Sequence, residues 1–296
     1  MRAALVPLLR EIGDLKRVTS AGRPGSIAER AFRRGWTTLT AGIPAEDVAL
    51  ETTAGCLAAT RLGDLDLASL AHLGVSAVEV AAMERAALAE FGNLLSSALA
   101  DRLAEACGRR ASFDDQGPDV SFVARLAAQP RAGATCPGKP RIVLGPAENH
   151  AEHCAIVAVY AVLLAEPEAD LGTVFLASLA HHLHNAAMPD AGFTGEMLLG
   201  QHLEPVIERA TEQALAELPT DLRGRVVAAR TVLRDADTPE GRAFHAGDVL
   251  DRVLEIEQHL ARSRVTMDDI LGDMALVHDG PVKSFHDRVL AEMGLG

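Results

Sequence analysis

Apolar residues recur at the spacing of an α-helix along most of the chain, and no segment alternates apolar and polar residues over a convincing length. Recurrence every three or four residues predicts helix, whereas a half-buried strand requires alternation. The helices expected in the first part of the chain cover residues 44–61, 65–73 and 76–107, the last being either one long helix or two helices broken near Gly92. We therefore expect an all-α fold with little or no sheet.

Residues 112–146 interrupt this pattern with a cluster of glycine and proline. The positions concerned are Gly117-Pro118, Pro130, Gly133, Pro137-Gly138 and Pro140. Such residues mark turns and loops, because proline lacks a backbone donor and glycine adopts conformations that other residues avoid. This segment is predicted to be a linker with one short helix over residues 120–128.

Helical spacing returns after residue 146. The helices expected there cover residues 147–165, 171–185, 195–217, 220–234, 240–262 and 267–277. The length of 296 residues allows one large domain or two of roughly 150 residues each. We predict a helical domain over residues 1–111, a linker over 112–146 and a second helical domain over 147–296.

An internal repeat relates the two helical regions. The segment Leu67–His72 recurs as Leu176–His181 with the same six residues, and Pro44–Glu51 aligns with Pro146–His153. Two collinear matches favour a duplicated helical unit, in which the first copy keeps the scaffold and lacks most of the histidines. The differing positions are His150 opposite Val48, His153 opposite Glu51 and His182 opposite Leu73.

Composition and charge limit the partners and the environment. Alanine and leucine, which favour helix, abound, and aromatic residues make up only 3% of the chain. The formal net charge of −13 argues against general nucleic-acid binding, which depends on clustered lysine and arginine. The four cysteines form no C-x-x-C pair, which is typical of reduced thiols in a cytoplasm.

Targeting and membrane segments are not expected. The N-terminal stretch is too short and too charged for a secretory signal. The longest apolar run of the second half, residues 155–165, has about half the length needed to span a bilayer. We expect a soluble cytoplasmic protein that binds neither nucleic acid nor a membrane.

Histidines are concentrated in the second half of the chain. Neutral imidazole is the commonest protein ligand of transition metals. His150 and His153 are three residues apart and therefore share one face of a predicted helix. His181 and His182 end the next predicted helix, so the histidines of these two helices together indicate a metal site. Of the 11 histidines, eight lie between residues 150 and 259: His150, His153, His181, His182, His184, His202, His245 and His259.

Three motifs in this region resemble the ligand helices of HD-domain proteins. Glu152–Ala158 resembles the first helix, Ser178–His182 the helix that gives the superfamily its name, and Phe244–Asp251 the last. The resemblance covers about residues 146–262 and implies an HD-like helical bundle with one or two divalent ions, Fe, Mn, Co or Zn. It implies a metal site centred on His153, His181 and Asp248, with Asp251 as the alternative carboxylate. His182 stands where the family has aspartate, which shifts the ligand preference towards Fe, Zn or Co.

The resemblance also implies roles for residues around the metal. His182 and His150 are further candidate ligands, and His202 with His245 would complete a second metal site. Substrate-facing or proton-transfer roles are expected for Asn185, Asp190 and Glu196. The candidates for binding the substrate are Lys139, Arg141 and His184. For Lys139 and Arg141 the alternative is a solvated entry loop.

These observations favour a metal-dependent phosphohydrolase that acts on a small phosphoester or a nucleotide. A di-iron oxygenase is a second hypothesis, because some HD proteins use two irons to activate O₂. The replacement of the motif aspartate by His182 and the ligand-poor first copy favour a third, a non-catalytic regulatory or binding protein. Fold class alone does not choose among them. The apolar helices of residues 78–103 would suit a homodimer interface or an intramolecular core equally well.

Overall fold

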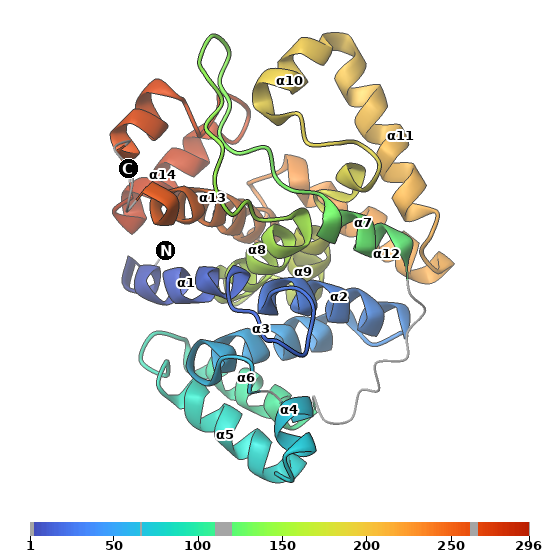
Figure 1. The fold of residues 1–296 in the computed structure, drawn as a ribbon, viewed down its shortest axis with the longest axis vertical. Helices are drawn as coiled ribbons and strands as arrows, with labels where there is room; N and C mark the ends of the chain where they lie inside the picture. The colour runs from blue at the N-terminus through green and yellow to red at the C-terminus, as the bar shows by residue number, and fades with distance from the viewer. Residues whose placement is uncertain (1–2, 66, 110–119, 261–265, 296) are drawn as a thin grey trace.

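The computed structural model describes residues 3–65, 67–109, 120–260 and 266–295, and within them it contains helices and no strand (Figure 1). The all-α prediction is confirmed. None of these helices combines the length and apolarity needed to cross a bilayer. The helices before the central loop are α1 (Val6–Gly13), α2 (Ile27–Thr40), α3 (Ala45–Leu62), α4 (Leu67–His72), α5 (Ala77–Ala89) and α6 (Ser97–Arg109). Those after it are α7 (Ser121–Ala128), α8 (His150–Leu164), α9 (Leu171–Ala180), α10 (Gly192–Leu199), α11 (Leu203–Leu215), α12 (Thr220–Ala229), α13 (Pro239–Leu260) and α14 (Lys283–Met293).

Some helix boundaries differ from the sequence expectation at glycines. Of the two alternatives for residues 76–107, the structure has the broken form, with Gly92 between α5 and α6. The expectation of one helix over 195–217 is wrong, because Gly200 adopts φ +51° and separates α10 from the helices that follow. Of the helix expected over 267–277, only residues 267–273 are helical, and Asp269–Asp273 form a π-helical turn.

Helix α8 is the centre of the fold because, after its first turn, it is apolar on every face. Its residues from His150 to Leu163 are buried, and helices that are hydrophobic all round lie in a core. Helices α2, α3, α9 and α13 pack around it (Figure 1). A capping box fixes its N-terminus: the Asn149 side chain accepts from the Glu152 backbone at 2.9 Å, and Glu152 accepts from the Asn149 backbone at 2.8 Å. This box holds the first turn, with His153, inside the core.

One hydrophobic core joins helices from the two predicted domains. Buried side chains from residues 1–111 and from residues 147–296 belong to the same contiguous cluster. Helix α3 packs against α8 and α9, and Trp36 of α2 makes an edge-to-face contact with Phe122 of α7 at a centroid distance of 5.0 Å. The division into domains stays a prediction, and the shared core means that the N-terminal helices directly support the histidine-rich region.

The two copies of the repeated hexapeptide pack differently. Leu176–His181 closes α9, which lies along α8, whereas Leu67–His72 forms α4, which packs on α5. The side chain of His181 is only 7% exposed, and His72 lies at the surface. The internal duplication therefore stays a prediction from the sequence.

The described part of the predicted linker contains α7, as expected, and then an arm beside α10 (Figure 1). In this arm Ala134 and Ile142 exchange two backbone hydrogen bonds of 3.0 and 2.9 Å. Gly133, next to this pair, has φ +75°, and a Cβ there would lie 2.2 Å from the carbonyl oxygen of Ile142. Only glycine fits this position without a shift of the backbone.

Helices α8 and α13 approach closely at Gly247, and this contact gives a first prediction. A Cβ at Gly247 would lie 2.9 Å from the carbonyl oxygen of Val157 and 3.0 Å from the amide nitrogen of Ala161. Overpacking costs about 1–3 kcal/mol, which we expect to exceed the ~1 kcal/mol that alanine gains over glycine in a helix. Gly247→Ala should therefore lower the free energy of unfolding in urea. Gly224→Ala in α12, where no atom lies within 4 Å, should raise it; stabilisation by both variants would contradict the close contact.

Candidate metal centre

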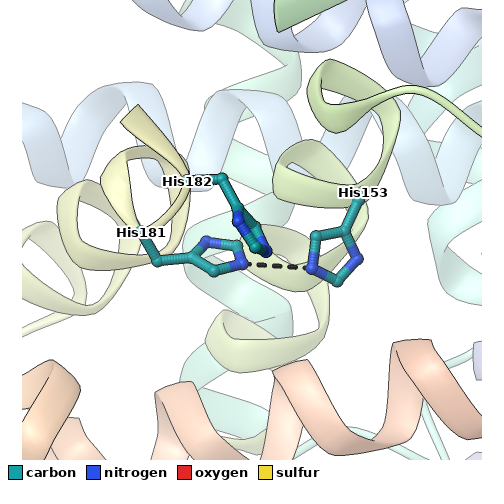
Figure 2. Close-up of side chains that lie close together, drawn as sticks. All are labelled: His153, His181 and His182. Atoms are coloured by element: carbon teal, nitrogen blue, oxygen red, sulfur yellow. Dashed lines mark hydrogen bonds between the residues drawn. The ribbon is translucent and has the colours of Figure 1, made fainter. Parts of the chain in front are cut away.

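Three side chains from three helices converge on one point in the core. His153 lies in the first turn of α8, His181 directly follows α9, and Asp248 lies in the middle of α13. The Nε2 atoms of His153 and His181 are 3.1 Å apart. Oδ1 of Asp248 lies 3.3 Å from Nε2 of His153 and 3.8 Å from Nε2 of His181. Figure 2 shows the rings of His153 and His181 directed toward each other, with His182 alongside.

The tautomers of the two imidazoles follow from their other partners. Nδ1 of His153 lies 2.7 Å from a carboxylate oxygen of Asp251, and Nδ1 of His181 lies 2.6 Å from the carbonyl oxygen of Ser178. Both oxygens can only accept, so each Nδ1 carries the hydrogen and each Nε2 carries a lone pair. Two lone pairs and the Asp248 carboxylate thus face one another with no donor between them. These three ligand atoms fit a transition-metal ion. The hydrogen bonds from each Nδ1 are of the kind that orient metal-bound histidines.

The local electrostatics keep these groups available to a cation. Burial, and then the neighbouring His153, lower the pKa of His181 to about 3, so its ring is neutral near neutral pH. Burial alone would raise the pKa of Asp248, but the Arg252 guanidinium and then His153 hold it well below its usual range. Arg252 donates to Oδ2 of Asp248 at 2.8 Å, which leaves Oδ1 facing the two imidazoles.

His182 lies beside this site with both ring nitrogens occupied. The ligand atoms of His153, His181 and His182 all lie within 4.8 Å of one another. However, Nδ1 of His182 donates to the side-chain oxygen of Asn185 at 2.8 Å, and its Nε2 accepts from Arg131 at 3.1 Å. Asn185 therefore orients His182, and ligation by His182 would require the Arg131 guanidinium to move away.

A buried lysine lies behind the site. Nζ of Lys16 is 2.5 Å from Glu148, 2.7 Å from Asp251 and 3.4 Å from Glu255, and the Lys16 side chain is 2% exposed. We refer to these four residues as the Lys16 cluster. Asp251, the alternative metal ligand in the sequence analysis, thus links the ammonium of Lys16 to Nδ1 of His153.

A cavity of about 280 Å³ opens next to His182. The stacked rings of Phe193 and His278, 3.6 Å apart, stand in its wall. Burial, and then the neighbouring Asp190, raise the pKa of the Glu196 carboxyl in this cavity. Apolar and charged side chains both line the cavity, so it could hold a small molecule with an anionic group. The larger apolar residues are Leu144, Phe193, Ile256, Met274 and Leu276, and the charged ones are Arg131, Glu148, Asp190, Glu196, Arg252 and Glu255.

The candidate substrate-binding residues before α8 lie away from the cavity lining. Lys139 and Arg141 are exposed, and the Arg141 guanidinium donates to the carbonyl oxygens of Ala132 and Ala191. Asp190 binds the same two loops from the cavity side, since it accepts from the backbone N–H groups of Ala132 and Gly192. Both residues fasten the arm to the start of α10.

The other candidate histidines are not part of the group formed by His153, His181 and Asp248. His202 is exposed. His150 is fully buried and lies 3.5 Å from Asp190, and burial lowers its pKa. Burial, and then Arg230, lower the pKa of His184 to about 4. His245 is buried in α13 with its Nε2 unpartnered, one turn before Asp248.

The sequence analysis did not identify three charged residues of the candidate site: Lys16, Arg131 and Arg252. Arg252 could have been found, because it stands four residues after Asp248 on a predicted helix and is therefore on the same face. Lys16 and Arg131 have no such local signal, since their partners at the site lie far away in the chain.

The chain was compared with protein-family models, with curated proteins and with solved structures, and no match was found in any of the three comparisons. The function proposed below is therefore argued from the geometry of the site and from the motif resemblance given above.

Acid pH is expected to destabilise the metal-free protein through its buried histidines. Burial lowers the pKa of His286 to about 4, well below the ordinary value of 6.5. Between these values the unfolded chain binds the extra proton, so the free energy of unfolding falls as pH falls. His286→Gln should reduce this slope by up to about 1.4 kcal/mol per pH unit. Urea denaturation in chelator at pH 6.5 and pH 4.5 measures it, and an unchanged slope would contradict the expectation.

Proposed function

We propose that the protein is a metal-dependent phosphohydrolase acting on a small phosphoester. The observation that carries the proposal is the convergence of the His153 and His181 lone pairs and the Asp248 carboxylate beside a cavity that contains arginines. These three residues would hold one divalent ion, with His182 as the further candidate ligand. Such an ion lowers the pKa of a bound water and polarises a phosphoryl oxygen.

The residues of the cavity have chemically suitable roles around the bound phosphoester. Arg131 would bind the phosphate oxygens, because a guanidinium pairs with phosphate through two parallel hydrogen bonds. Glu196, with its raised pKa, would donate a proton from its carboxyl to the leaving oxygen. Arg252 would hold Asp248 in place, and Asn185 would orient His182.

The activity is tested with metal-stripped protein reloaded separately with Fe, Mn, Co or Zn. We expect metal-dependent phosphate release from a panel of phosphomonoesters, lost in His153→Ala and kept in His202→Ala, whose ring is exposed. Metal binding without release of phosphate from any substrate would contradict the proposal and favour a non-catalytic binding protein. Two irons per chain with O₂ uptake would favour the oxygenase.

Arg131 and Arg141 can be distinguished as phosphate-binding residues by a matched pair of variants. Arg131→Gln should raise KM by about 10–100-fold, because a hydrogen bond to a charged group contributes about 1.5–3 kcal/mol. Arg141→Gln should leave KM near the wild-type value, since Arg141 does not line the cavity and its guanidinium contacts two backbone carbonyls. Steady-state kinetics on one phosphomonoester measures both variants. A raised KM in Arg141→Gln and an unchanged KM in Arg131→Gln would instead indicate a phosphate site at the loop that contains Arg141.

A further inference from the structure

The Lys16 cluster has the composition of a cation site that is already filled. Lys16 ends the 3₁₀ helix Asp14–Lys16, and its ammonium lies among the carboxylates of Glu148, Asp251 and Glu255. All four side chains are 7% exposed or less. Burial opposes the charge of Lys16, but the three carboxylates outweigh it and raise the pKa of the ammonium well above its usual range.

The ammonium lies next to a set of atoms that could otherwise hold a metal ion. Ligand atoms of Glu148, His153 and Asp251 all lie within 4.8 Å of one another. Nζ of Lys16 lies within 2.7 Å of the Glu148 and Asp251 carboxylates. Asp251 also binds Nδ1 of His153, so this position adjoins the candidate metal centre across a single imidazole ring.

The charges of this region balance without a second metal ion. Arg17 lies 2.5 Å from Glu255, and Arg131 lies 3.4 Å from Glu148. Three buried carboxylates therefore have three cationic partners, and removal of the lysine would leave one negative charge uncompensated. The cations are Lys16, Arg17 and Arg131, and the carboxylates are Glu148, Asp251 and Glu255.

We propose that the Lys16 ammonium is a built-in cation that occupies a second cation position of the metal centre. The chain then binds one divalent ion, between His153, His181 and Asp248, and the lysine takes the place of a second. This inference rests on the proposed metal site for its first ion. The second position, with its carboxylate oxygens, would accept a hard cation such as Mn²⁺ once the lysine is removed.

The test is a count of Mn²⁺ ions by titration, with the free ion followed by electron paramagnetic resonance. We expect one bound ion per chain in the wild type and two in Lys16→Met. The additional ion should be lost again in the double variant Lys16→Met/Glu148→Gln. Lys139→Met, which removes an exposed lysine, should bind one ion like the wild type.

Several outcomes would overturn the inference. Two ions in the wild type, or one ion in a folded Lys16→Met variant, would show that the lysine does not fill a cation position. If Lys16→Met fails to fold in chelator, Mn²⁺ should restore folding, and the absence of any rescue would count equally against the inference. No ion in the wild type with one in Lys16→Met would contradict the proposed metal site, and would support only the part of the inference in which the lysine fills a cation position.

Discussion

Replacement of Lys16 by methionine is expected to lower the free energy of unfolding of the metal-free protein by about 3–5 kcal/mol. The ammonium lies among three carboxylates that are themselves 7% exposed or less, so its removal leaves a negative charge buried and unpaired. Methionine keeps a similar length, which limits any contribution from a cavity. Urea denaturation at pH 7 in chelator measures the change.

Lys139→Met is the matched control, because it removes the same charge from an exposed position. Surface substitutions of this kind usually change stability by less than about 0.5 kcal/mol. A Lys16→Met variant as stable as Lys139→Met would mean that the buried carboxylates are protonated or solvated, and would contradict the charge balance described for the cluster.

Replacement of Asp248 by asparagine is expected to weaken binding of the divalent ion by more than about 100-fold, since loss of an outer partner alone weakens metal sites by about 10–100-fold. Asparagine keeps the shape of the side chain, removes the anionic ligand and leaves the Arg252 guanidinium beside the site. Competition with a chromophoric chelator measures the affinity. Asp287→Asn, in an exposed pair with Lys283, should bind the ion as the wild type does. Equal affinities of the two variants would remove Asp248 from the ligand set.

Local sequence pattern predicted most of the helices and three side chains that the structure brings together. The periodicity of apolar residues predicted α8 and α13, and histidine spacing with the motif resemblance selected His153, His181 and Asp248. These three side chains then meet within 3.8 Å. Such a prediction is possible where the direction of a side chain depends mainly on the helix that carries it.

Contacts between distant segments were not predictable in the same way. Lys16 is a single charged residue in an N-terminal turn, and nothing local indicates that it lies under α13 beside Asp251. The arm around Ala134 was interpreted as a linker because its glycines and prolines are turn signals whether or not the turns pack. Lys139 and Arg141 preceded the first ligand helix in sequence, but the course of this arm points them to the surface.

The structure therefore makes the N-terminal helices part of the candidate site. Lys16, from a segment that the repeat analysis assigned to a ligand-poor copy, contacts three carboxylates of the second half and through Asp251 orients the ring of His153. Outer partners of this kind fix the tautomer and direction of a metal-binding imidazole.

Elemental analysis tests the metal centre most directly. The protein is purified without added metal and analysed by mass spectrometry next to His181→Ala, which removes one of the two facing lone pairs. The account predicts one transition-metal ion per chain in the wild type and none in the variant. No metal in either protein, and none taken up when each is soaked in Fe, Mn, Co or Zn, would contradict it.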